Sequence, residues 1–177
     1  MARFTGFDEV FSALYVDFDN IYTRFLEIDP EAARAFGSVP YRWLRWIENH
    51  ALRILSGEGV RRRILKRMCY LNPQRYQEYR NPFIRSAFQV VDCPPLTTRG
   101  KTSTDIHLVM DCMDDLSHST HFDEFIILSG DADFTPLLIR LQEHARRTLV
   151  LSVGYSSPAY TAAASWRIRE DWFLQQA

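Results

Sequence analysis

Residues 124–134 read EFIILSGDADF, a mostly apolar run of strand length followed by serine, glycine and two aspartates. Residues 13–20, ALYVDFDN, follow the same plan, with an apolar run that ends at Asp17. Short continuous apolar runs are typical of central strands that are buried on both faces of a parallel sheet. Ligands of open α/β sheets bind beyond the carboxyl ends of the strands, where the strand order reverses. Asp17 and Asp131 occupy that position on two separate strands.

The rest of the chain alternates runs of strand length with stretches of helical period. We expect helices at about residues 41–55, 75–87, 104–116, 135–145 and 158–164, and strands at about 63–71, 88–91, 148–153 and 171–174, the last at an edge. This alternation predicts an α/β fold with three layers, in which helices flank a central, mainly parallel sheet of about five strands. No repeat or linker divides the sequence, so a single domain over residues 1–177 with a core at about 11–175 is expected.

The composition is that of a globular protein. Of 177 residues, 46% are hydrophobic and 14% aromatic, which excludes disordered and collagen-like classes. No apolar run approaches the roughly 18 residues of a membrane span, and the amino terminus lacks the apolar core of a signal peptide. We therefore expect a cytoplasmic protein with no membrane partner. Cys69, Cys93 and Cys112 form no Cys-x-x-Cys pair, so buried free thiols are predicted.

Charges are segregated along the chain although the formal net charge is only -1. Residues 1–33 hold seven acidic and two basic side chains, and residues 34–101 hold four acidic and fourteen basic ones. Residues 102–133 then hold eight acidic side chains and no basic ones. If folding brings the two acidic blocks together, they form a carboxylate cluster inside a cationic rim.

Asp105 is the most informative acid of the second block. On a helix its side chain falls on the apolar stripe with Leu108 and Cys112, whereas Asp111 and Asp114 fall on the solvated face. An inward carboxylate must be paired or bound to a metal, because an isolated buried charge is costly. A favourable interaction with the helix dipole in the first turn is the alternative explanation.

Four carboxylates form the candidate metal site: Asp17, Asp105, Asp131 and Asp133. Without a cation they would repel one another, and an all-oxygen ligand set favours Mg²⁺ or Mn²⁺. Asp133 has a second interpretation as the N-cap of the helix that follows it. Lys101 precedes the helix of Asp105, where it either reaches a phosphate oxygen or is a solvated loop residue. Gly130 is expected to permit a tight exit from its strand.

These residues together resemble the NYN domain family of PIN-like metal-dependent ribonucleases, in its LabA-like branch. The matching motifs are Asp17-x-x-Asn20 after the first strand, Lys101 with Asp105, and Ser129-Gly130-Asp131-x-Asp133-Phe134. The resemblance implies a catalytic Mg²⁺ or Mn²⁺ site at Asp17, Asp105, Asp131 and Asp133, with Asn20, Ser129 and Lys101 as supporting groups. It also implies RNA as the substrate.

Further RNA contacts are predicted from the basic block. Arg61 and Arg63, in the run of residues 61–63, and Arg99 would supply affinity that is independent of RNA sequence. In a strand, alternate residues face opposite ways, so at most about half of such a run can face one ligand. A solvated strand entrance is the alternative interpretation of this run.

Two other functions stay open at the level of sequence. Asp17 and Asp19 also resemble the nucleophile loop of haloacid-dehalogenase-like phosphatases, in which the first aspartate is phosphorylated and the second is the acid/base. A catalytically silent RNA-binding NYN module is the other alternative. Metal-dependent cleavage of RNA separates the three functions. The sequence does not decide whether the chain forms a homodimer.

Overall fold

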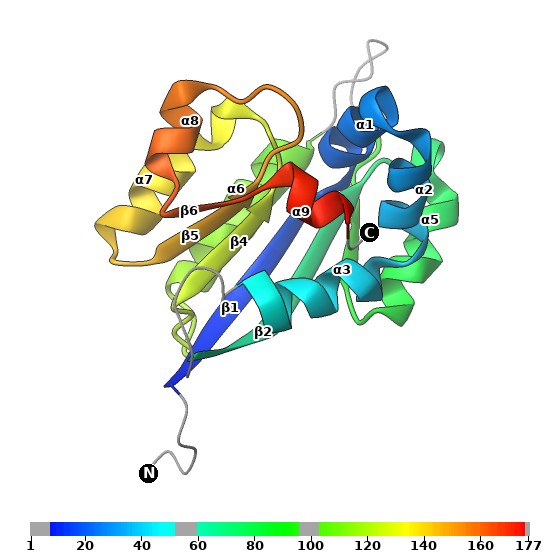
Figure 1. The fold of residues 1–177 in the computed structure, drawn as a ribbon. Helices are drawn as coiled ribbons and strands as arrows, with labels where there is room; N and C mark the ends of the chain where they lie inside the picture. Colours follow the sequence, from blue (N-terminus) through cyan, green and yellow to red (C-terminus); the bar gives the residue numbers. More distant parts are fainter. Residues whose placement is uncertain (1–7, 52–59, 96–102, 176–177) are drawn as a thin grey trace.

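The computed structural model describes residues 8–51, 60–95 and 103–175. Its centre is a six-stranded sheet with the order β3-β2-β1-β4-β5-β6, in which every neighbouring pair is parallel (Figure 1). Helices cover both faces, so the three-layer α/β fold expected from the sequence is confirmed, with one strand more than the expected five.

The strands are β1 (Asp8–Asp17), β2 (Val60–Leu71), β3 (Gln89–Asp92), β4 (Glu124–Leu128), β5 (Arg147–Leu151) and β6 (Trp166–Ile168). The helices are α1 (Phe18–Ile28), α2 (Pro30–Ser38), α3 (Pro40–Trp46), α5 (Pro73–Arg85), α6 (Thr104–Leu116), α7 (Thr135–Glu143), α8 (Pro158–Ala163) and α9 (Glu170–Leu174). Two short irregular turns complete the described elements: the π-helical turn η1 (Ile47–Ala51) and the 3₁₀ turn η2 (Ala132–Phe134). Among the described residues no helix has the length and apolar character needed to cross a membrane.

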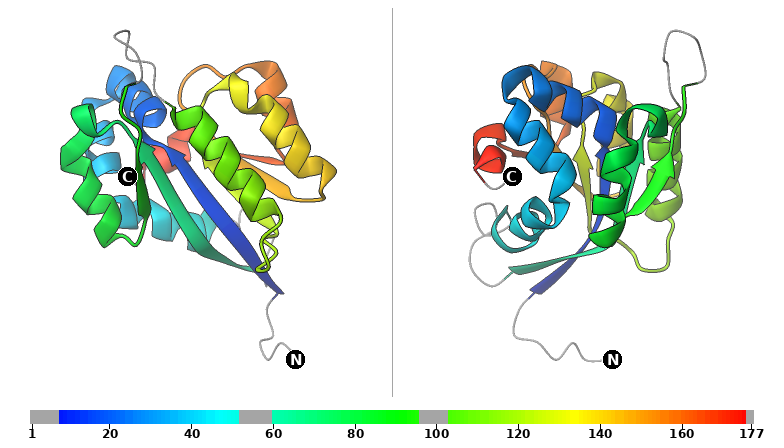
Figure 2. Two further views of the ribbon diagram at one scale, coloured as in Figure 1. Left: turned by 180° about the vertical axis from the view of Figure 1, so that it is seen from behind. Right: turned by 90° about the vertical axis from the view of Figure 1, so that its right-hand side faces the viewer.

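The two faces of the sheet carry separate cores. Leu14 and Val16 of β1 face helices α1, α2, α3, α5 and α9, whereas Ala13 and Tyr15 face α6, α7 and α8 (Figure 2). All four side chains are completely buried. Burial on both sides explains why the sequence of this strand is a continuous apolar run rather than an alternating one.

The first core is unusually aromatic and fixes helix α1. Phe18 opens α1 and packs against Phe36 of α2 and Phe83 of α5, with ring centroids 5.6 and 5.5 Å apart. Such ring pairs add to the free energy gained by burial. The first turn of α1, which follows Asp17 directly, is therefore held by contacts with two other helices.

Three sequence-based assignments need correction. Residues 171–174 are helical rather than an edge strand, because Phe173 of α9 stacks on Phe25 of α1 at 5.7 Å and the edge position is filled by β6. The helix expected at 41–55 is α3 followed by η1, and its end lies outside the described residues. Residues 18–38, to which no element was assigned, form α1 and α2. The expected buried free thiols are confirmed for all three cysteines.

Candidate active site

The strand order reverses between β1 and β4. From β1 the chain adds β2 and β3 on one side of the sheet, and then β4, β5 and β6 on the other. Val16 lies opposite Leu128 in the register of the two strands, so β1 and β4 end side by side. Their carboxyl ends are therefore the expected ligand position of such a sheet.

A hydrogen-bond network joins the ends of these two strands. The buried Asp17 accepts a hydrogen bond from the Ser129 hydroxyl at 2.9 Å and one from the Asn20 backbone N–H at 3.3 Å. In return, the Asn20 side-chain oxygen accepts from the Gly130 N–H at 2.9 Å. Ser129 Oγ also accepts from the Asp131 N–H at 3.2 Å. Asn20 and Ser129 thus fix the loop after β4 against the start of α1.

Beside this network lies an open pocket of about 480 Å³. Its lining residues are Asp17, Asp19, Asn20, Thr23, Arg24, Glu27, Arg75, Thr104, Asp105 and Asp131. Three of the predicted carboxylates, Asp17, Asp105 and Asp131, therefore line one pocket although they come from β1, α6 and the loop after β4. Figure 2 shows the first turn of α6 beside the start of α1 at this end of the sheet.

Asp105 lies where the helical pattern predicted. It is half-buried at the start of α6, and Leu108 and Cys112 on the same stripe are completely buried. Asp17 and Asp105 both line the pocket, and the negative charge of Asp105 contributes to the raised pKa of Asp17.

Burial dominates the protonation of Asp17. Removal from water, with a smaller contribution from the charges of Asp105 and Asp19, raises its pKa to about 7 against the opposing hydrogen bonds from Ser129 and Asn20. The hydrogen bonds come from neutral groups. The pocket thus holds a carboxylate whose charge the surrounding protein does not neutralise.

Asp19 is a pocket residue that was absent from the predicted metal site. Its carboxylate accepts a hydrogen bond from the Asn72 N–H at 3.0 Å, and burial raises its pKa. Arg75, at the start of α5, acts in the opposite direction on that pKa and lines the same pocket. The signal in the sequence was the position of Asp19, two residues after Asp17 and in the first turn of α1.

Asp133 is exposed and does not line the pocket. The interpretation of Asp133 as the N-cap of α7 is also wrong, because Phe134 occupies that position and α7 has no side-chain cap. Asp131 instead caps the turn η2 and accepts from the Asp133 N–H at 2.9 Å. Asp111 is not an ordinary surface acid, since it accepts a hydrogen bond from the Tyr70 hydroxyl at 2.5 Å. Gly130 has no strained backbone, and a Cβ there would meet Asn20 Oδ1 at an ordinary 3.6 Å.

The predicted basic contacts are not at this pocket. Arg61 and Arg63 lie opposite Glu9 and Phe11 in the register of β2 and β1. Glu9 precedes Asp17 by eight residues, which places this end of the strand about 26 Å from the carboxylates. The expectation that the arginine run borders the acidic site is therefore wrong. The predicted contacts Lys101 and Arg99 lie outside the described residues.

The donor chemistry of the pocket suits a hard cation. Its carboxylate and amide oxygens are the ligands that Mg²⁺ and Mn²⁺ prefer. The neighbouring Cys69 supplies no thiolate, because burial and the charges of Asp19 and Asp17 raise its pKa. Among the residues described, no three His, Cys, Asp or Glu side chains form a group that could hold a metal ion. Mg²⁺ commonly takes only one or two protein carboxylates, with water and substrate phosphates as its other ligands.

Comparison with known proteins agrees with this architecture. The sequence profile of the NYN domain matches residues 12–169. A crystal structure of a protein of unknown function from Vibrio parahaemolyticus has a similar fold, with a TM-score of 0.67 and 17% sequence identity over 96% of this chain and 98% of that one. No curated protein matches the sequence. The profile match spans most of the chain, including both strand-end motifs, and the chain therefore belongs to the NYN domain family.

Proposed function

We propose that the chain is a metal-dependent ribonuclease of the LabA-like branch, which hydrolyses RNA phosphodiester bonds with Mg²⁺ or Mn²⁺. The observation that carries this proposal is the shared pocket of Asp17, Asp105 and Asp131, supplied by three separate elements at the point where the strand order reverses. Asp19 joins this set from α1. Asp133 is left out, because it is exposed and outside the pocket lining. The branch rests on the motif residues quoted above.

A bound cation would resolve the electrostatics of this pocket. The carboxylates repel one another, and burial of Asp17 adds a cost that its neutral hydrogen-bond donors only reduce. Because no three of the described carboxylates form one closed ligand group, one or two of Asp17, Asp105 and Asp131 would hold the ion, with water and substrate phosphates as its other ligands. When bound, such an ion lowers the pKa of a water nucleophile and stabilises the charge that develops on the phosphate oxygens.

The chain's own residues orient the ligand groups. Ser129 and Asn20 restrict the Asp17 carboxylate through two hydrogen bonds, and Asp131 is fixed by its bond to the Asp133 N–H. Side chains held in this way lose little entropy when they bind, which is the main requirement for a preorganised site.

The shape of the pocket favours a polynucleotide. Asn20, Thr23, Arg24 and Glu27 follow one face of α1 at helical spacing, so the pocket extends along about two turns of that helix. Arg75 lines it from α5. Arginine binds phosphate through paired hydrogen bonds. Arg24 and Arg75 are therefore suited to the phosphates that flank the cleaved bond, which a small phosphate ester lacks.

The test is cleavage of a labelled single-stranded RNA of thirty nucleotides with Mg²⁺ or Mn²⁺, followed on a denaturing gel. Asp105→Asn should abolish cleavage. Asp114→Asn is the matched control, because it removes an exposed carboxylate from the same helix. Cleavage by Asp105→Asn at the wild-type rate, with contaminating nuclease excluded, would refute the role of Asp105.

Metal binding has an independent readout in thermal stability. A ligand bound only by the native state stabilises it by about 2.7 kcal/mol at a hundredfold excess over Kd. Millimolar Mn²⁺ should therefore raise the Tm of the wild type and raise that of Asp105→Asn less. Release of phosphate from a monoester without RNA cleavage would favour the phosphatase, and RNA binding with neither activity would favour the silent module.

A further inference from the structure

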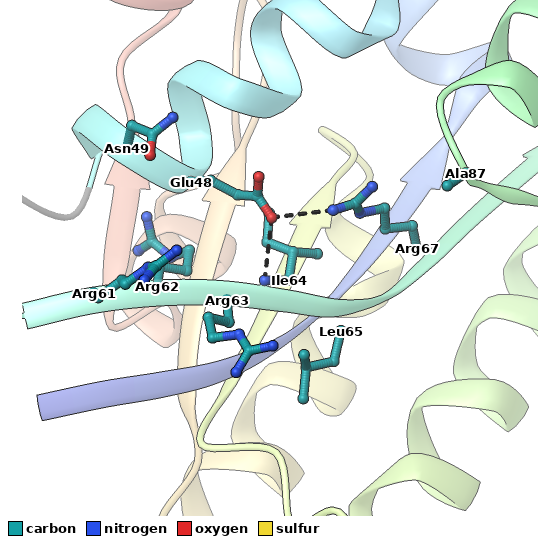
Figure 3. A pocket seen from close by; sticks show the side chains of 9 residues that line it. All are labelled: Glu48, Asn49, Arg61, Arg62, Arg63, Ile64, Leu65, Arg67 and Ala87. Atoms are coloured by element: carbon teal, nitrogen blue, oxygen red, sulfur yellow. Dashed lines mark hydrogen bonds and ion pairs between the residues drawn. The ribbon is translucent and has the colours of Figure 1, made fainter. Parts of the chain in front are cut away.

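A second pocket, of about 410 Å³, lies at the amino end of β2. Its lining residues are Glu48, Asn49, Arg61, Arg62, Arg63, Ile64, Leu65, Arg67 and Ala87 (Figure 3). Arg62 and Ile64 are buried while Arg61, Arg63 and Leu65 are exposed, so the pocket contains residues from both faces of one strand. A pocket lined in this way follows the edge of the strand.

No strand pairs with that edge in the described part of the chain. β2 begins at Val60, but its pairing with β3 begins only at Met68. Before Met68, β2 pairs on one side only, with β1. A bulge at Leu65 interrupts that pairing, which resumes at Lys66 with a shifted register. Val60–Ile64 therefore offers about five residues of free edge, a usual length for a strand.

One contact shows that backbone hydrogen-bonding groups of this edge face away from β1. The Ile64 N–H points away from β1 and reaches the Glu48 carboxylate at 3.4 Å. Glu48 also pairs with Arg67 at 3.1 Å, so it keeps a partner if a peptide carbonyl replaces it at Ile64. A row of unpaired N–H and C=O groups is the template to which an extended peptide adds.

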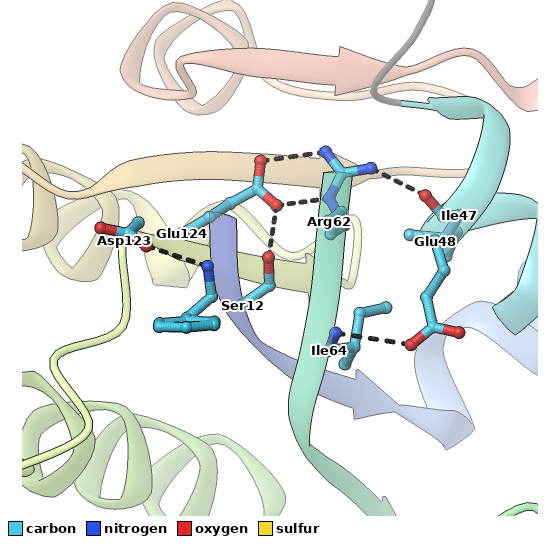
Figure 4. Close-up of polar contacts among 8 residues, drawn as sticks. Ser12, Ile47, Glu48, Arg62, Ile64, Asp123 and Glu124 are labelled. Carbon is cyan, nitrogen blue, oxygen red and sulfur yellow. Dashed lines mark hydrogen bonds and ion pairs between the residues drawn. The ribbon is translucent and has the colours of Figure 1, made fainter. Parts of the chain in front are cut away.

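Arg62 does not contribute to binding at this pocket. Its guanidinium is completely buried and bonds to both oxygens of Glu124, at 2.6 and 3.0 Å, and to the Ile47 carbonyl (Figure 4). The charges left for a ligand are those of Arg61, which is exposed, and of Arg63, whose side chain is 50% exposed and lies 3.7 Å from Glu9.

We propose that the free edge of β2, residues Val60–Ile64, binds an extended acidic segment of a protein partner by addition of a strand. Arg61, Arg63 and Leu65 alternate on the exposed face of β2. A segment with acidic residues at two alternate positions, followed by an apolar one, matches that face across the strands. Charged residues on an edge normally prevent pairing between copies of a protein, and here they select an acidic strand.

The backbone of the edge favours a peptide over RNA. RNA phosphates accept hydrogen bonds but donate none, and the donors of RNA, its 2′-hydroxyls and bases, do not repeat with the donor and acceptor spacing of a strand. A peptide backbone supplies both donors and acceptors. The partners of this edge in β1, Asp8 to Ser12, precede Asp17 by nine to five residues, so the edge lies roughly 16 to 30 Å from the carboxylate pocket and is a site separate from the proposed cleavage.

The experiment measures binding of a fluorescein-labelled peptide, TETETLT, to the full chain by fluorescence anisotropy. The double variant Arg61→Glu/Arg63→Glu should bind it at least tenfold more weakly and should bind TKTKTLT instead. Arg140→Glu/Arg167→Glu is the matched control, because it reverses two exposed arginines elsewhere and should bind like the wild type.

Two further measurements test the strand geometry with the unaltered protein and against RNA. Methylation of a backbone nitrogen removes the N–H donor that an added strand uses on alternate residues. One version of the peptide is N-methylated on its threonines and a second on its other residues, and at least one of them should bind tenfold more weakly than the parent peptide. Equal binding of both versions and of the parent would refute strand addition. Unchanged peptide binding by the double variant, with weakened binding of a twelve-nucleotide RNA, would assign the edge to nucleic acid instead. If the variant Arg61→Glu/Arg63→Glu does not fold, Arg61→Ala/Arg63→Ala is measured in its place.

Discussion

The carboxylate pocket lies at the carboxyl ends of β1 and β4, and the arginine-lined edge lies at the amino end of β2. In the first, the buried Asp17 receives hydrogen bonds from neutral groups only. In the second, the buried Arg62 is bonded to both oxygens of Glu124. A buried charge with an ionic partner is explained by the fold. A buried charge with neutral partners that faces an open pocket points to a ligand.

The largest expected effect is the loss of RNA cleavage when a carboxylate of the pocket is replaced. Asp17→Asn and Asp131→Asn should each lower RNA cleavage by about a hundredfold or more, because loss of even an indirect partner of a metal costs 10–100-fold. Both variants should remain folded, since each keeps the size of the side chain. Initial rates at saturating Mn²⁺ measure the effect. Wild-type cleavage by either variant would remove that residue from the site.

The next largest effect is on the free energy of unfolding, which should distinguish the buried Arg62 from the exposed Arg61 and Arg63. Arg62→Met leaves the Glu124 carboxylate buried without its partner and should lower the free energy of unfolding by about 3–5 kcal/mol. Arg61→Met and Arg63→Met should change it by less than about 0.5 kcal/mol. Urea denaturation measures all three. Equal effects of the three substitutions would contradict the distinction between a structural arginine and two surface ones.

The pH dependence of stability tests the burial of Asp17. Its pKa is about 7 in the native state against an ordinary value of 3.8, so the native state keeps a proton that the unfolded state releases between these pH values. The free energy of unfolding should therefore fall as the pH rises from 4 to 7, by up to roughly 4 kcal/mol from this group.

Asp17→Asn is the control for this dependence, because it cannot titrate. In chelator, its free energy of unfolding should equal that of the wild type near pH 4 and exceed it above pH 7. Urea denaturation at several pH values gives the difference. Parallel curves for the two proteins would show that Asp17 ionises freely in the native state.

The comparison also shows what the sequence could predict. β1, β4 and the residues at their ends were predictable, because an apolar run and the polar residues that follow it are adjacent in the chain. The inward direction of Asp105 followed from the helical spacing of α6. Each of these features depends on local geometry, with the strand order supplied by the rules for parallel sheets.

Features that depend on register or on distant packing were missed. The placement of Arg61 depends on the register in which β2 pairs with β1, and the sequence alone does not give that register. Arg75 reaches the pocket only because α5 packs beside α1. Asp115 lies on α6 near two acids expected on the solvated face, yet it is buried by contacts with Tyr15 and Lys66 of the neighbouring strands.

The smallest expected effect concerns how the loop of the carboxylate pocket is held. An added Cβ at Gly130 would lie 3.6 Å from both Asn20 Oδ1 and Ser152 Cβ, which is ordinary contact. Gly130→Ala should therefore change the free energy of unfolding by less than about 0.5 kcal/mol and leave RNA cleavage unaltered. The hydrogen bonds of Asn20 and Ser129, rather than the lack of a side chain at Gly130, would then be what positions the loop.

Gly37→Ala is the comparison variant for this prediction. At Gly37 a Cβ would lie 2.5 Å from the ring of Tyr79, which is itself held by a hydrogen bond of 2.8 Å between its hydroxyl and that of Tyr22. Overpacking of this kind typically costs about 1–3 kcal/mol, more than alanine gains over glycine in a helix. Urea denaturation of the two variants gives the contrast. A larger loss for Gly130→Ala than for Gly37→Ala would mean that the loop after β4 needs a glycine because an added Cβ strains its contacts with Asn20 and Ser152.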